Sequence, residues 1–136
     1  ALTTTQLFGA IQLTSAQQNL FKAAKAGNTA FFTDITSHDP NITDENGMTP
    51  LNIAAQNNYL GIIKNLLTHA KIEINKQDEK TGKTALHYAI EYGHLEVVHK
   101  LLSQEKINVN APDYQHKTPL HYAITTYSSL LSKLLD

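Results

Sequence analysis

A hexapeptide that recurs three times at nearly constant spacing constrains the fold of this chain more than any other feature. The segment TPLNIA at 49–54 returns 35 residues later as TALHYA, and after another 34 residues as TPLHYA. Apolar pairs follow each copy, at 62–67, 97–102 and 130–135, and a divergent copy lies at 20–35. Units of this length at a fixed period are typical of stacked repeats that share one elongated core. The 136 residues therefore predict about four units rather than one globular core.

Each copy predicts two helices joined by a turn. All three copies begin with a Thr whose hydroxyl can accept a hydrogen bond from the first helical turn, and in two of them Pro follows at the first helical position. Asn57-Asn58 and Gly93 can adopt a left-handed conformation and end the first helix. Apolar residues at i, i+1, i+4 and i+5 then lie on one face of the second helix. The pairs at 130–135 predict the same second helix in the last copy, after a one-residue deletion.

Short extended arms and turns connect these units. Apolar residues alternate at 72–74 and at 107–109, which indicates extended backbone. The turn residues Asp-Glu-Asn-Gly at 44–47 then bend the chain back toward the next helix. We therefore expect an all-α solenoid of about four helix–turn–helix units with hairpin-like fingers.

The box at 118–123, the Gly93-His94 pair, the Leu-Leu endings and the Asn-x-x-Asp fingers together resemble the ankyrin repeat. Asn52 replaces the box His in one copy and His116 replaces a finger Gly, departures that concern local loops rather than the fold. The resemblance implies one ankyrin-repeat domain over 1–136, with a capping segment at 1–14, a divergent repeat at 15–43, and repeats at 44–77, 78–112 and 113–136.

At the N-terminal end, a solenoid has to cover the apolar face of its first unit. The sequence of Ser15 to Gln18 resembles a capping box and predicts a helix that begins near Ala16. Leu7, Phe8 and Ile11 have helical spacing and predict a short preceding helix that shields the first repeat.

At the C-terminal end, two interpretations stay open. The residues Ser128, Ser129, Ser132 and Lys133 would form the polar outer face of an end cap. Alternatively, the leucines of 130–135 stack on a further segment of a longer protein, and the repeat at 113–136 is truncated. We favour the second interpretation.

Composition excludes several classes of function. The 11 basic residues are all Lys and are balanced by 12 Asp and Glu, so the net charge is −1. This balance and the lack of Arg argue against a nucleic-acid surface that uses bidentate recognition. Without Cys, disulfides and thiolate sites are excluded, and no apolar run approaches the roughly 20 residues of a membrane helix. We therefore expect an intracellular, cytoplasmic protein that binds no nucleic acid and does not insert into membranes.

The polar residues do not form a recognisable catalytic or metal site. The resemblance implies structural roles for His87 and His121 in the box, where they bond the backbone and the box Thr, and for His94 beside Gly93. The other His residues lack the spacing of a helical zinc site, and no Ser lies in a nucleophile elbow. The carboxylate pairs lie at exposed finger tips, an unsuitable setting for acid–base catalysis. We predict no catalytic residue, metal or cofactor, and no enzyme activity in this segment.

Asn75 and Asn110 occupy matching positions at the foot of successive arms, and Asn41 is their equivalent one unit earlier. In ankyrin domains such side chains brace the loop by bonding its backbone. The resemblance also implies a second role, because an asparaginyl hydroxylase modifies this position in some ankyrin proteins. Leu67 and Leu102 lie eight residues before Asn75 and Asn110, a spacing similar to those substrates. Bracing is the preferred interpretation and hydroxylation the alternative.

Stacked repeats present their fingers and first helices along one continuous concave surface. Tyr92 and Tyr114 are the strongest candidates for partner contacts, since exposed Tyr is favoured at binding hot spots. The candidate partner-binding residues on the fingers are Glu45, Asn46, Met48, Lys80, Thr81, Lys83, Tyr114, Gln115 and Lys117, and those on the first helices are Gln56, Asn57, Glu91, Tyr92, Thr125 and Thr126.

The function that follows from the resemblance is recognition of a partner protein by a monomeric module. An alternative is the targeting domain of a larger enzyme, such as a bacterial effector delivered into host cells, with its catalytic part outside the chain. The Asn-, Ile- and Lys-rich composition without Arg, a bias of AT-rich genomes, motivates that alternative. A catalytic domain encoded after Asp136 would support the enzyme, and further repeats or a stop codon would support an adaptor. A third alternative is a spacer segment that captures no partner.

Overall fold

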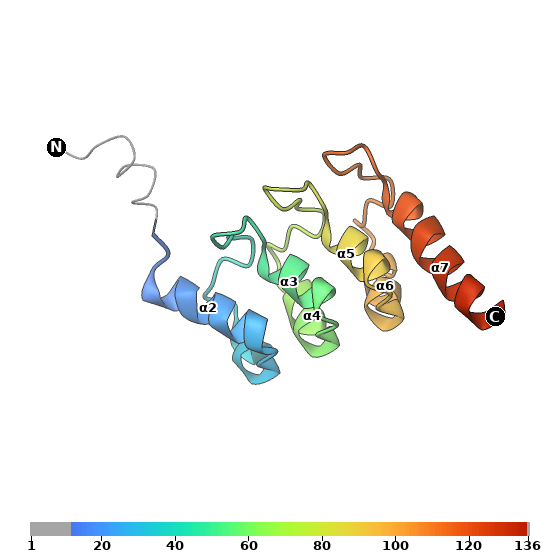
Figure 1. Ribbon diagram of the computed structural model, residues 1–136. Helices are drawn as coiled ribbons and strands as arrows, with labels where there is room; N and C mark the ends of the chain where they lie inside the picture. The colour runs from blue at the N-terminus through green and yellow to red at the C-terminus, as the bar shows by residue number, and fades with distance from the viewer. Residues whose placement is uncertain (1–11, 136) are drawn as a thin grey trace.

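The computed structural model describes residues 12–135 as a stack of helices with loops that project from one side (Figure 1). One layer contains α2 (Ser15–Ala26), α3 (Pro50–Gln56), α5 (Ala85–Glu91) and α7 (Pro119–Leu135). The other layer contains the 3-10 helix η1 (Thr29–Asp34), α4 (Leu60–Leu67) and α6 (Leu95–Leu102). Residues 12–135 include no strand, and the all-α solenoid predicted from the sequence is confirmed.

The core runs along the stack between the two layers. Helices α2, α3, α5 and α7 pack side by side in that order, while α4 packs against η1 and α6 packs against α4. Ala54 and Ala89 are fully buried on the first layer, where a small side chain lets neighbouring helices approach closely. The second layer contributes Ile62, Leu66 and Leu101, which are also fully buried. Each unit therefore depends on its neighbours for its core.

The predicted starts and ends of the helices are confirmed in the two middle units. The hydroxyl of Thr49 accepts a hydrogen bond from the Asn52 amide at 3.1 Å, and that of Thr84 accepts one from the His87 amide at 3.4 Å. After α3 and α5 the backbone passes through a left-handed residue, Asn58 with φ 62° and Gly93 with φ 72°. This conformation reverses the chain and lets the second helix fold back on the first.

The last copy differs from the prediction, because α7 is one continuous helix of 17 residues. The paired leucines predict a turn that is followed by a second helix at 130–135. By repeat register, Tyr127 occupies the position of Gly93, and a left-handed backbone is unfavourable for a bulky L-residue. The helix therefore continues through the position where the other units turn, and the expected helix–turn–helix in this copy is wrong.

The first helix begins one residue earlier than predicted. Thr14 rather than Ser15 is the N-cap, and its hydroxyl accepts from the Gln17 amide at 3.3 Å. The Gln17 side chain accepts from the Thr14 amide at 2.8 Å, which completes a capping box. The predicted short helix with Leu7, Phe8 and Ile11 lies outside the described residues.

The loops between units form hairpin-like fingers that bond to one another. Within the fingers, the Asp78 amide donates to the Lys83 carbonyl and the Asp113 amide to the Lys117 carbonyl, both at 2.8 Å. Between fingers, the Glu79 amide donates to the Gly47 carbonyl at 3.0 Å, and the Tyr114 amide to the Thr81 carbonyl at 2.9 Å. These bonds connect three fingers into one continuous edge along the stack (Figure 1).

Candidate partner-binding surface

A buried aspartate organises each finger, so the expectation that the carboxylate pairs at 44–45 and 78–79 are exposed is wrong for Asp44 and Asp78. Asp44, Asp78 and Asp113 are all buried, and one carboxylate oxygen of each accepts hydrogen bonds from two backbone amides of its own finger. The distances lie between 2.7 Å and 3.0 Å, which is ideal for a charged acceptor. The carboxylates thereby fix the backbone of the fingers that carry most of the predicted contact residues.

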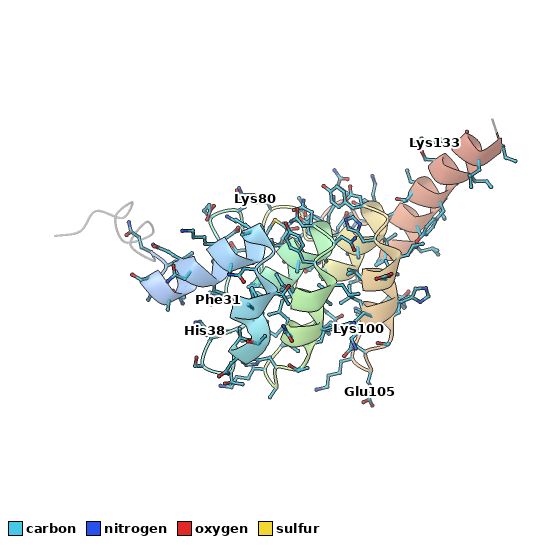
Figure 2. All side chains as sticks on the ribbon, turned by 90° about the horizontal axis from the view of Figure 1, so that it is seen from below. Phe31, His38, Lys80, Lys100, Glu105 and Lys133 are labelled. Atoms are coloured by element: carbon cyan, nitrogen blue, oxygen red, sulfur yellow. The ribbon has the colours of Figure 1, made fainter. Side chains whose placement is uncertain are left out.

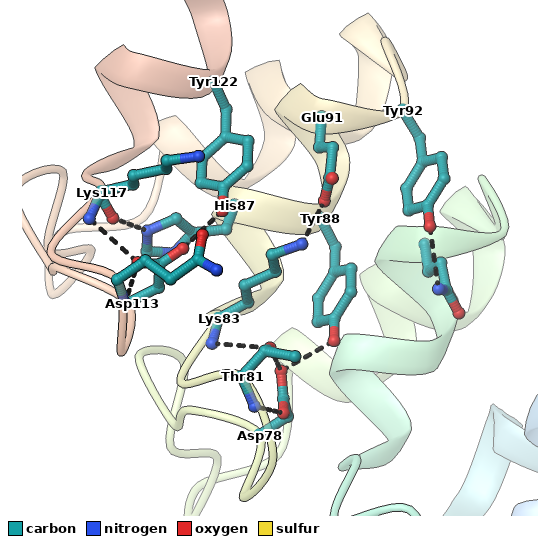
Figure 3. A network of polar contacts seen from close by, with 12 residues as sticks. Asp78, Thr81, Lys83, His87, Tyr88, Glu91, Tyr92, Asp113, Lys117 and Tyr122 are labelled. Atoms are coloured by element: carbon teal, nitrogen blue, oxygen red, sulfur yellow. Dashed lines mark hydrogen bonds and ion pairs between the residues drawn. The ribbon is translucent and has the colours of Figure 1, made fainter.

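In the second and third fingers, a Tyr from the following helix satisfies the other carboxylate oxygen. The Tyr88 hydroxyl donates to Asp78 at 2.7 Å, and the Tyr122 hydroxyl donates to Asp113 (Figure 3). Burial alone would raise the pKa of the Asp78 carboxyl, but hydrogen bonds from Thr81, Tyr88 and backbone amides outweigh it and hold this pKa below its usual value. Burial and the bond to Asp78 raise the pKa of the Tyr88 phenol. Asp78 therefore stays ionised at neutral pH.

In the first finger, a cation rather than a phenol interacts with the second oxygen of the buried carboxylate. Ile53 occupies the position of Tyr88, so the ammonium of Lys25 on α2 takes the place of the phenol. It lies 3.2 Å from Asp44 and 2.9 Å from Glu45. The hydrogen bond to Glu45, with the contact to Asp44, raises the pKa of Lys25 against the opposing effect of burial. The buried Asp44 oxygen has no hydrogen bond within the described residues, so this ion pair is its compensation.

Lys83 lies inside the surface rather than on it. Its ammonium is 2.8 Å from Glu91 and lies 5.6 Å and 5.1 Å from the ring centroids of Tyr88 and Tyr122. These contacts match an ion pair supported by two cation–π interactions (Figure 3). Lys83 and Glu91 were both predicted as partner contacts, and each is half-buried and engaged with the other.

Two tyrosines on this side of the molecule combine exposure with fixed position. The side chain of Tyr92 is 51% exposed, its hydroxyl accepts from the Gln56 amide group at 3.3 Å, and its ring stacks on His94. Tyr114 is 58% exposed, and its ring lies over Gly82 so closely that a Cβ there would come within 2.4 Å of it. Each ring is therefore in contact with a neighbouring residue while about half of the tyrosine stays exposed to solvent. The prediction that they contact a partner stays a prediction.

A model of ankyrin repeats in three copies matches residues 20–113 and 73–136. The chain belongs to the ankyrin-repeat family. Ankyrin repeats are in general protein–protein interaction modules, and such domains are typically non-catalytic. None of the curated proteins compared with the chain matches it.

The ankyrin box histidines have the structural roles that the resemblance implies. The Thr84 amide donates to Nδ1 of His87 at 3.1 Å, so the ring proton resides on Nε2 and donates to the Lys117 carbonyl at 2.9 Å. His121 accepts from the Thr118 amide at 2.9 Å in the same way. Burial lowers the pKa of His87, although the bond to Lys117 opposes this effect. Residues 12–135 contain no group of three or more carboxylate or imidazole side chains placed to hold a metal ion.

The arm asparagines brace the ankyrin stack. The Asn75 amide group donates to the Lys106 carbonyl at 2.8 Å and accepts from the Asn108 amide at 2.7 Å. Asn41 makes the equivalent pair of bonds one unit earlier, to the 71–73 arm. Asn110 is exposed, and its amide N–H donates to the Asn108 side chain at 3.0 Å. Bracing accounts for Asn41 and Asn75, and hydroxylation of Asn75 or Asn110 stays a prediction.

The remaining predicted contact residues are distributed along the fingers and first helices of the ankyrin stack. The Lys80 ammonium bonds the Asn46 side chain at 3.1 Å, and the Thr126 hydroxyl bonds the Glu91 carbonyl at 3.3 Å. Asn57, Thr81, Gln115, Lys117 and Thr125 are exposed, while Met48 and Gln56 are half-buried.

A groove of about 550 Å³ lies beside α7 on the same surface and is lined in part by predicted residues. Of the lining residues, Glu91, Lys117, Thr125 and Thr126 are predicted partner contacts, whereas His121, Tyr122 and Ile124 are not. Tyr122 falls within the ankyrin box, for which the sequence predicts no partner contact, and Ile124 is exposed because no helix of residues 12–135 covers it. Among the described residues, no helix is both long and apolar enough to cross a membrane.

Proposed function

We propose that the chain binds a partner protein through the surface formed by its fingers and first helices, which we call the recognition surface. The observation that supports this most is the hydrogen bonding of each finger to the next, with Glu79 on Gly47 and Tyr114 on Thr81. A surface that is ordered before binding loses little conformational entropy on association. The recognition surface therefore needs few strong contacts to hold a partner.

Tyr92 and Tyr114 are the anchors in this proposal. Each ring is more than half exposed and is already held by its own neighbours. A rigid aromatic ring supplies apolar area at low entropic cost, and its hydroxyl can bond at the edge of the contact. Lys83 and Glu91 pair with each other beside Tyr88 and Tyr122, and in this proposal they keep those two rings in place.

The test maps the surface before any partner is known. A photo-crosslinking amino acid replaces Tyr92 in one variant and Tyr114 in another, and a matched control carries it at Lys64, an exposed residue of α4 in the second layer. We expect the same protein to be captured at positions 92 and 114 and not at 64. Equal capture at all three positions, or none at the two tyrosines, would reject the recognition surface.

The captured protein then gives a quantitative test. Replacing both Tyr92 and Tyr114 by Ala should weaken its binding by more than about 2 kcal/mol, or roughly 30-fold in Kd. Lys64→Ala should leave the Kd unchanged because it lies in the other layer. An unaltered affinity in the double variant would show that the anchors lie elsewhere.

A further inference from the structure

The exposed side of α7 carries an unusually regular apolar stripe. Leu120, Ile124, Tyr127, Leu131 and Leu134 follow one another at intervals of four, three, four and three residues, and all are exposed. This spacing places them on one face of the helix, as in the seam between paired helices. Figure 2 shows the C-terminal half of α7, with Lys133, projecting beyond the other helices. The stripe is therefore available to another molecule.

A second uncovered apolar area lies on α6 and the arm that follows it. Leu95, Leu102 and Val109 are all exposed. Their equivalents one unit earlier are Leu60 and Leu67, which are half-buried, and Ile74, which is buried. The difference arises because α6 packs against α4, whereas no second-layer helix within residues 12–135 packs on the outer side of α6.

The sequence of α7 contains the type of helix that would cover α6. Residues 130–135 repeat the paired apolar pattern of 62–67 in α4 and 97–102 in α6. Within those two helices, Ile62, Ile63, Val97 and Leu101 are fully buried by this pattern. In α7 the matching Leu131 and Leu134 are exposed. A covering helix and an uncovered site are thus both present, but the continuous helix holds them apart.

We propose that two copies of this chain exchange the C-terminal halves of their α7 helices. Residues 128–135 of each copy pack on α6 of the other, against Leu95, Leu102 and Val109, and continue the second layer that α4 and α6 form. The exchange is reciprocal, so one contact is made twice in a closed dimer. This proposal differs from the sequence-based expectation of a monomer.

A second copy is favoured over folding back within one chain because of the residue at the turn. Return of 128–135 onto its own α6 requires a left-handed residue near Tyr127, where the middle units have Asn58 and Gly93. That conformation is unfavourable for an L-residue such as Tyr, because its Cβ comes too close to the following carbonyl oxygen, and the continuous helix avoids it. Residues 128–135 carry a single charged side chain, Lys133, so the exchanged half of α7 brings little charge to the apolar area on α6.

The first experiment compares two substitutions of one residue by sedimentation velocity and light scattering. The intact chain should have twice its monomer mass of 15.1 kDa. Tyr127→Gly supplies a residue that accepts the left-handed turn and should shift the protein to monomer. Tyr127→Ala removes the same ring but keeps a strong helix former, and should remain dimeric. A monomeric intact chain, or identical behaviour of the two variants, would overturn the exchange.

The second experiment locates the contact. The chain has no Cys, so Leu102→Cys and Leu134→Cys can be made in separate samples, mixed, and joined by a short bismaleimide. We expect the 102–134 heterodimer to be the main product, since it forms only if α7 of one copy lies on α6 of another. Predominance of the 134–134 product would indicate pairing of two α7 stripes instead, and absence of any product would indicate a monomer. Either result would refute the proposal.

Discussion

The first helix of the third unit and the last helix start with nearly the same sequence, TALHYA and TPLHYA. Their equivalent apolar residues nevertheless differ in burial. Leu86 on α5 is 1% exposed, whereas its equivalent Leu120 on α7 is 66% exposed. Ile90 is 7% exposed, and its equivalent Ile124 is 60% exposed. The residues are alike, and within residues 12–135 the difference is that α5 has a second-layer helix and a following unit packed beside it, whereas α7 has neither. In a stack of repeats, the burial of a residue therefore depends on the neighbouring units as much as on the residue itself.

The largest expected effect compares these matched leucines. Leu86→Ala should lower the free energy of unfolding by about 2–5 kcal/mol, because it opens a cavity in a closely packed site. Leu120→Ala removes the same atoms from an exposed site and should change it by less than about 0.5 kcal/mol. Urea unfolding followed by circular dichroism at low protein concentration measures both. Equal losses would mean that α7 is covered as well as α5 is.

The next effect compares the two ways of satisfying a finger aspartate. Tyr88→Phe removes one donor from the buried Asp78 and should cost about 1–3 kcal/mol. Lys25→Met removes the ion pair of Asp44 and should cost less, about 1 kcal/mol, since the Lys25 side chain is nearly half exposed. Tyr59→Phe is the control, because its hydroxyl makes only a long 3.4 Å bond to the Lys25 carbonyl. A larger loss for Lys25→Met than for Tyr88→Phe would reverse our ranking of the two fingers.

The third comparison uses the box position, which holds Asn52 in one unit and His87 in the next. The pKa of His87 is lowered in the folded protein by burial, so the unfolded chain takes up a proton first. Stability is therefore complete above about pH 6.5 and decreases as the pH falls through this value toward the folded pKa. His87→Asn copies the other unit and should reduce the loss of stability between about pH 7.5 and pH 5.5.

The control for this pH dependence is His116→Asn. His116 is exposed and has φ 63°, a conformation that Asn tolerates, so its replacement should keep the fold. The pH dependence of unfolding should then match that of the unchanged chain. If His116→Asn flattens the profile as much as His87→Asn does, the titrating group is not the buried box histidine.

Much of the fold could be predicted because the signals are local. A Thr before a helix and a Gly or Asn after it act through their own backbone, so Thr49, Thr84, Asn58 and Gly93 could be placed from the sequence. The sequence does not predict the continuous α7, because the paired leucines of 130–135 indicate a second helix, whereas Tyr127 lacks the turn chemistry that a second helix requires. The prediction from apolar periodicity is wrong in this copy, because the left-handed backbone conformation that the turn requires is unfavourable at this position.

The recognition surface could be predicted only in part, because repeat register gives the position of a side chain in the stack but not the residues that it contacts. The register placed Lys83 on the surface, yet its ammonium is directed to Glu91 and two tyrosine rings. Tyr88 on α5 and Tyr122 on α7 are 34 positions apart in the sequence, and their rings come together through the packing of the two helices. The role of Lys25 was missed for the same reason, since its partner Asp44 lies in a different unit.

The smallest expected effect separates binding from folding on the recognition surface. Tyr92 is the C-cap residue of α5 and by register corresponds to Thr126 on α7, which bonds the Glu91 carbonyl. Tyr92→Phe removes only the bond from Gln56 to an exposed hydroxyl and should alter the free energy of unfolding by less than about 0.5 kcal/mol. Thermal unfolding of Tyr92→Phe beside the intact chain measures this. A decrease in the free energy of unfolding above 1 kcal/mol would show that Tyr92 contributes to the core of the stack. Reduced binding of Tyr92 variants would then result from misfolding rather than from the loss of an anchor.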